Sequence, residues 1–143
     1  MNFTKLERAL ASDLFISPMV SIETPPTIEE IKGLSEKMPF TLSNDHIQLL
    51  QRFGGSFLDE IRIEAPNQIE VEDGLISFAN NYNGYRFVYN QNNEIFGIDH
   101  NGGAIIKLAN SMDEFFNDVF LGRAGESFYG SDWINDLVDA GLI

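Results

Sequence analysis

The chain has 143 residues, enough for one ordinary domain that buries roughly two thirds of its unfolded surface. Its 22 acidic residues outnumber the 9 basic ones. The net charge of −13 disfavours direct nucleic-acid binding and favours a basic protein partner, although such a charge also serves solubility alone. The absence of cysteine excludes disulfide frameworks, thiolate metal sites and cysteine nucleophiles. No apolar run is long enough for a membrane span or a secretory signal, so we expect a cytosolic protein that does not bind membranes.

Two capping boxes predict helices near the start of the chain. Thr4 stands three residues before Glu7, and Thr27 stands three residues before Glu30. In this pattern the threonine accepts a hydrogen bond from the first turn while the glutamate reaches back to the cap. Behind the second box, helical spacing predicts a buried stripe formed by Ile28, Ile31 and Leu34.

A third helix is predicted to begin after Ser43. Leu42 and Ile47 occupy the two positions of a hydrophobic staple around this serine. The glycine pair at residues 54–55 is expected to end the helix, because no phosphate-loop pattern surrounds it. The inner face of the helix is expected to carry Ile47, Leu50 and Phe53.

Short β-strands are predicted in the middle of the chain. Three candidates come first: residues 61–65, 69–72 and 75–78. After a turn at residues 80–84, three more follow: residues 85–89, 94–99 and 104–108. The links between the last three are rich in asparagine and glycine, which favours hairpins. These segments predict an antiparallel, meander-rich sheet of about five to six strands.

After residue 108 the apolar period changes from two to about 3.6. Ser111 is predicted to cap a helix there, with Glu114 closing the capping box and Gly122 ending it in the left-handed conformation. The apolar face of this helix comprises Met112, Phe115, Phe116, Val119 and Phe120. A last helix is predicted between Ser131 and Gly141. We therefore expect an α+β fold over residues 1–143, a single domain whose sheet is packed by helices from both ends of the chain.

The sequence shows no pattern that predicts catalysis, a cofactor or a metal site. His46 and His100 each follow an aspartate, but a metal site would need further ligands from elsewhere in the chain. Residues 125–130 miss the second glycine of a serine-hydrolase elbow by one place. Arg62 and Arg86 lie in predicted strands, where pairing with acidic residues is more common than anion binding. An enzyme would need a carboxylate pair or an Asp-His pair that converges in a pocket.

The acidic residues are dense between residues 59 and 73, where Arg62 is the only base. We interpret this cluster as a surface that binds a basic protein partner. The alternative is a solvated acidic face without a partner. The cluster consists of Asp59, Glu60, Glu64, Glu70, Glu72 and Asp73.

Three parts of the chain resemble the SUKH superfamily. Residues 38–55 are similar to its Leu-Pro, amphipathic helix and terminal glycine. Residues 76–88, with Asn83-Gly84 at their centre, are similar to its loop-and-strand centre. The most specific likeness is the strand at residues 94–99 followed by Ala-Asn-Ser and two phenylalanines within residues 109–116.

The resemblance covers about residues 27–121 and departs from the family pattern at Met38, His46-Ile47 and Met112. It implies an α+β domain that acts by binding and has no catalytic group. The superfamily includes fungal regulators of cell-wall assembly and bacterial immunity proteins paired with polymorphic toxins. A bacterial member is expected to neutralise a cognate toxin domain, for example a nuclease whose basic cleft suits an acidic partner. The alternative is a regulatory or scaffold module with an endogenous partner, as in the fungal members.

Overall fold

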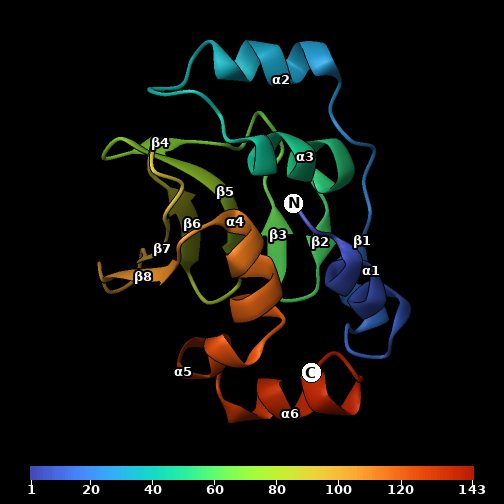
Figure 1. Ribbon diagram of the computed structural model, residues 1–143. Coiled ribbons are helices and arrows are strands. Elements are labelled where there is room, and N and C mark those ends of the chain that lie inside the picture. The colour runs from blue at the N-terminus through green and yellow to red at the C-terminus, as the bar shows by residue number, and fades with distance from the viewer.

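An antiparallel sheet of eight strands forms the centre of the molecule (Figure 1). The structure is a computed structural model that describes residues 1–143. The strands lie in the order β1, β2, β3, β5, β6, β7, β8, and β4 pairs with β5. Their bounds are β1 (Val20–Ser21), β2 (Phe57–Leu58), β3 (Ile61–Ile63), β4 (Val71–Glu72), β5 (Leu75–Asn81), β6 (Tyr85–Tyr89), β7 (Ile95–Asp99) and β8 (Ile105–Ala109). The predicted α+β class and antiparallel meander are confirmed. The strand number is larger than predicted because β1 and β2 have two residues each, too few to show alternation.

Short polar side chains shape the turns of the meander. Between β5 and β6, Asn81 Oδ1 accepts hydrogen bonds from the backbone N–H groups of Asn83 and Tyr85, both at 3.0 Å. Asn90 and Asp99 accept corresponding bonds in the next two turns. A side chain that satisfies turn donors in this way favours a tight reversal. The local sequence therefore determines where each hairpin turns.

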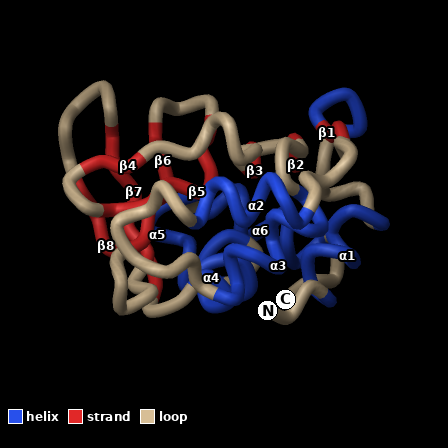
Figure 2. The backbone as a smooth tube through the Cα atoms, turned by 90° about the horizontal axis from the view of Figure 1, so that it is seen from above, coloured by secondary structure: helices blue, strands red, loops and turns tan.

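The helices cover one side of the sheet. Figure 2 shows the strands in red along one side of the molecule and most of the helices in blue along the other. In Figure 1, α2 lies at one end of the molecule and α6 at the opposite end. The helices are α1 (Thr4–Ala11), α2 (Ile28–Ser35), α3 (Asn44–Phe53), α4 (Met112–Glu114), α5 (Glu126–Tyr129) and α6 (Ser131–Asp139).

Three predicted helix starts are confirmed. Thr27 Oγ1 accepts a hydrogen bond from the backbone of Glu30 at 3.2 Å, and the glutamate reaches back to complete the capping box of α2. Ser43 caps α3, and Ser111 caps α4, each through its side-chain oxygen. Ile28 differs from its prediction, because this side chain is 58% exposed instead of belonging to the buried stripe.

Two other predicted caps are wrong. Thr4 lies inside α1, and its N–H donates to Asn2 Oδ1 at 3.0 Å, so Phe3 takes the N-cap position without a side-chain bond. Ser131 likewise lies inside α6, which begins after Gly130 at a φ of 91°. In both cases the residue before the predicted cap already begins the turn.

The aromatic helix after β8 is not a regular α-helix. Only α4 is α-helical, and Phe115–Phe120 continue as a π-helix in which Leu121 N donates to Phe116 O at 3.1 Å. Gly122 was predicted to be left-handed, but its φ is −149°, so that prediction is wrong. A Cβ at this position would lie 2.5 Å from the carbonyl oxygen of Asp118, and this close approach accounts for the glycine.

Strand β8 forms an open edge of the sheet. Ile105 and Ile106 on this strand are 56% and 40% exposed. Beside them, Lys107 Nζ donates to Glu94 Oε2 at 2.6 Å. An open edge presents unpaired backbone groups to a further strand, and a lysine on the edge discourages that pairing.

Candidate functional site

The six acidic residues predicted to bind a partner do not form one surface. Asp59 has 6% of its surface exposed, and Glu64 has none. Glu60 is half-buried beside Asp59. The other three lie in or next to the hairpin of β4 and β5 and reach solvent: Glu70, Glu72 and Asp73.

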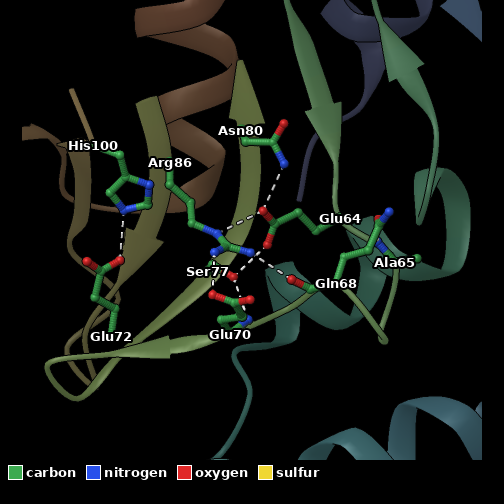
Figure 3. A network of polar contacts seen from close by, with 9 residues as sticks. All are labelled: Glu64, Ala65, Gln68, Glu70, Glu72, Ser77, Asn80, Arg86 and His100. Carbon is green, nitrogen blue, oxygen red and sulfur yellow. Dashed lines mark hydrogen bonds and ion pairs between the residues drawn. The ribbon is translucent and has the colours of Figure 1, made fainter. Parts of the chain in front are cut away.

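Glu64 is the centre of a network of polar contacts (Figure 3). Its Oε1 accepts from Ser77 Oγ at 2.5 Å, and its Oε2 accepts from Asn80 Nδ2 at 2.9 Å and from Arg86 Nε at 3.0 Å. A buried carboxylate is tolerated when donors satisfy its oxygens in this way. Glu64 is therefore a structural residue and is not accessible to a partner.

Arg86 ties the loop before β4 to strand β6. Besides Glu64, its guanidinium donates to Gln68 O at 2.7 Å and to Glu70 Oε2 at 2.7 Å (Figure 3). Burial lowers the pKa of Arg86, but the carboxylates of Glu64 and Glu70 outweigh that effect and raise it above its ordinary value. The predicted pairing of strand arginines with acids is thus confirmed for Arg86. It is wrong for Arg62, which forms no ion pair and lies over an aromatic ring.

Asp59 and Glu60 form the turn between β2 and β3. Asp59 has a left-handed φ of 60°, and its Oδ1 accepts from the backbone N–H of Ile16 at 3.1 Å. This bond holds the segment after α1 against the turn. Glu60 has no basic partner. Burial and the adjacent charge of Asp59 raise the pKa of Glu60.

The β4–β5 hairpin carries the exposed members of the cluster. Its turn consists of Asp73 and Gly74, both with positive φ, which matches the twist of a hairpin. Glu72 Oε2 lies 3.0 Å from His100 Nε2 (Figure 3). Asp73 forms no ion pair, and the side chain of Glu70 is 70% exposed although it contacts Arg86. These three carboxylates can be reached by a partner.

The two histidines do not form a common site. His46 lies in the first turn of α3, as predicted, and is completely buried with its Nδ1 2.8 Å from Tyr89 Oη. Burial lowers the pKa of His46 to about 3. His100 is an exposed turn residue, as predicted. No group of three or more His, Asp or Glu side chains is arranged so that it could hold a metal ion.

A cleft that sequence reasoning missed opens between the end of the sheet and the last two helices, α5 and α6. It has a volume of about 330 Å³ and three carboxylates in its lining: Glu60, Asp132 and Asp136. A signal for it exists in the sequence. Asp132, Asp136 and Asp139 follow one another at i, i+4 and i+7, which places them along one side of a helix.

The fold is thus an α+β antiparallel sheet covered by helices. Comparison with known families matches residues 25–118 to the SMI1 / KNR4 family (SUKH-1). The match covers about two thirds of the chain, and this protein belongs to that family. The predicted resemblance is therefore confirmed. Neither the comparison with curated proteins nor that with solved structures found a match. None of the helices has the length and apolar character needed to cross a lipid bilayer.

Proposed function

We propose that this protein is a cytosolic, non-catalytic immunity protein that binds and neutralises a cognate toxin domain with a basic surface. The observation that carries the proposal is membership of the SUKH-1 family together with a net charge of −13. The resemblance implies action by binding, and the charge favours a basic partner. A nuclease is one toxin class that fits, because it needs a basic cleft for phosphates.

The exposed carboxylates of the β4–β5 hairpin are the part of the predicted cluster that supports this function. Glu70, Glu72 and Asp73 are accessible, whereas Asp59 and Glu64 are committed to internal bonds. Complementary fields speed the encounter of two proteins more than they tighten the final complex. The hairpin would therefore act mainly on the association rate.

Co-expression tests the proposal. The C-terminal domain of the large protein encoded next to this one would be expressed alone and together with this chain. We expect toxicity that this protein suppresses and a tight one-to-one complex. A harmless neighbour that does not bind would contradict the immunity function.

The role of the hairpin needs a separate measurement. Charge reversal at Glu70, Glu72 and Asp73 should lower the association rate at low salt, and the difference should shrink as salt screens the charges. A matched control reverses three exposed acids that lie outside the hairpin, on other elements: Glu29, Asp118 and Glu126. Equal rates for the hairpin variant and the wild type at low salt would remove the hairpin from the interface.

The second candidate function is a regulatory or scaffold module that binds an endogenous protein. The SMI1 / KNR4 description of the matched family favours it, since fungal regulators of cell-wall assembly belong to the superfamily. Affinity purification from the native cell separates the two functions. A stable endogenous partner, with no toxic neighbour, would support the module.

A further inference from the structure

The cleft beside α6 is acidic on several sides. Glu60 comes from the β2–β3 turn, while Asp132 and Asp136 come from α6. A second hollow adjoins it, because the two share Asp136, and adds the carboxylates of Asp13 and Asp139. None of the nine lysines and arginines lines either hollow. The nearby Arg8 donates to the backbone oxygen of Gly141 and forms no ion pair with these carboxylates. The field in the cleft therefore attracts a cation.

The other walls of the cleft are aromatic and fixed in position. The ring of Phe128 meets those of Tyr85 and Tyr129 edge-on, with centroids 4.9 Å apart in both pairs. Trp133 stacks on Phe120 at 5.7 Å, and its Nε1 donates to the carbonyl oxygen of Phe120 at 2.6 Å. Aromatic faces next to carboxylates form a setting that attracts a planar cation such as a guanidinium.

One polar group at this cleft has no partner in the protein. The hydroxyl of Tyr129 is buried and makes no hydrogen bond. Burial, reinforced by the negative charge of Glu60, raises the pKa of Tyr129, so the hydroxyl keeps its proton. Leaving a buried hydroxyl unpaired destabilises the fold. A ligand that brings N–H donors to this hydroxyl would offset part of that cost by donating to its oxygen, while the O–H proton needs an acceptor of its own.

We propose that the cleft between the sheet end and α6 receives an arginine side chain of the partner protein, with its guanidinium held by Glu60, Asp132 and Asp136 and stacked against the aromatic wall. This inference rests on the proposed function, since it assumes a basic protein partner. Arginine fits better than lysine because its planar, multi-donor group can bond to several carboxylates while it lies on a ring.

The cleft combines residues from inside and from outside the range that matches the family. Glu60 and Tyr85 lie within the residues that match the family, whereas the α6 acids and Trp133 lie outside the matched range of 25–118. Four of the nine lining residues therefore come from the matched range, and five come from the segment that follows it. A contact built in this way would distinguish the partner of this protein from partners of other members.

A titration of the full chain with a defined probe tests the cleft directly. N-acetyl-arginine amide would be added to isotope-labelled protein while the indole N–H signal is followed by NMR; Trp133 is the only tryptophan. We expect a saturable shift of this signal. The citrulline analogue, which has nearly the same shape but no charge, should cause none. An equal shift with citrulline, or no shift with arginine, would overturn the inference.

Variants of the cleft carboxylates test whether the probe binds in the cleft. The double change Asp132→Asn with Asp136→Asn should raise the Kd of the arginine probe about tenfold or more, because two of the three lining carboxylates lose their charge. The matched control, Glu29→Gln with Glu30→Gln, changes the same net charge on α2 at the other end of the molecule (Figure 1). If both double variants bind the probe equally, the cleft is not the site.

Measurements with the toxin domain separate this inference from the proposed function. If the toxin binds, the cleft variant should mainly raise the dissociation rate, because it removes an anchor. The hairpin variant should mainly lower the association rate. A toxin that binds wild type and the cleft variant with the same Kd would overturn the inference alone. A toxin that binds neither would overturn the proposed function as well.

Discussion

Carboxylates occupy two contrasting settings in this protein. Glu64 is fully buried, yet both of its oxygens have donors, among them the guanidinium of Arg86. In the cleft beside α6, Glu60, Asp132 and Asp136 are more open but have no basic partner at all. An acid compensated within the fold serves stability, whereas an uncompensated one remains available for binding. The net charge of the chain does not distinguish the two.

The largest expected effect on stability comes from removing the cation that pairs with Glu64. Arg86→Met removes the cation and leaves Glu64 buried with only neutral donors, which should cost about 3–5 kcal/mol of the free energy of unfolding. Urea denaturation at neutral pH measures this cost. The variant should also lose the hydrogen bond that Arg86 donates to the backbone oxygen of Gln68 in the loop before β4.

A second carboxylate on the same guanidinium provides the control. Glu70 also pairs with Arg86, but its side chain is 70% exposed. Glu70→Gln should therefore cost less than about 1 kcal/mol, as for surface ion pairs in general. Equal losses for Arg86→Met and Glu70→Gln would contradict the assignment of Glu64 as the buried, stabilising partner.

The buried, unpaired ring of His46 should make the free energy of unfolding depend on pH. Burial lowers the pKa of His46 to about 3 in the folded state, against 6.5 as its ordinary value. As the pH falls below 6.5, the unfolded chain takes up this proton first. The contribution of His46 to the free energy of unfolding is therefore fully present above pH 6.5. It declines between pH 6.5 and pH 3, by about 1.4 kcal/mol per pH unit.

This contribution of His46 can be isolated by substitution. The unfolding free energy of His46→Gln, measured between pH 7 and 4.5, should fall less steeply than that of the wild type. His100→Gln is the matched control, because this histidine is exposed. The same slope for wild type and His46→Gln would show that the buried ring does not govern the acid sensitivity.

The smallest effect on stability is expected in the cleft. Asp132→Asn with Asp136→Asn relieves repulsion among the carboxylates, while Asp132 gives up a favourable position in the first turn of α6. The two effects oppose each other, so the unfolding free energy should change by less than about 1 kcal/mol. Thermal or urea unfolding measures it. A loss comparable to that of Arg86→Met would mean that the cleft acids stabilise the fold.

Much of the fold could be predicted because its signals are local. The turns of the meander use Asn81, Asn90 and Asp99, which act on residues two to four positions away. The caps Thr27 and Ser43 also act within one helical turn. The π-helix after α4 was not predictable, since its apolar spacing is compatible with a regular α-helix.

The setting of each acid could not be predicted, because it depends on distant residues. Glu64 and Glu70 stand in the same acidic segment, and both pair with Arg86, 22 and 16 residues further along. Their roles differ because Glu64 alone is buried, with further donors from β5 on its oxygens. The cleft likewise forms where α6 packs next to Glu60, which is more than 70 residues away. Helical spacing alone places Asp132 and Asp136 on one side, but it does not show what faces them.

The open edge at β8 has a consequence for how copies of the protein behave in a crowded solution. With Ile105 and Ile106 exposed on an unpaired strand, the sheet could extend into a neighbouring molecule. Lys107 opposes such stacking locally, and the net charge of −13 opposes it at longer range. Colloidal stability at high concentration therefore depends on the same excess of acids that suits the protein to a basic partner, and added salt should weaken both.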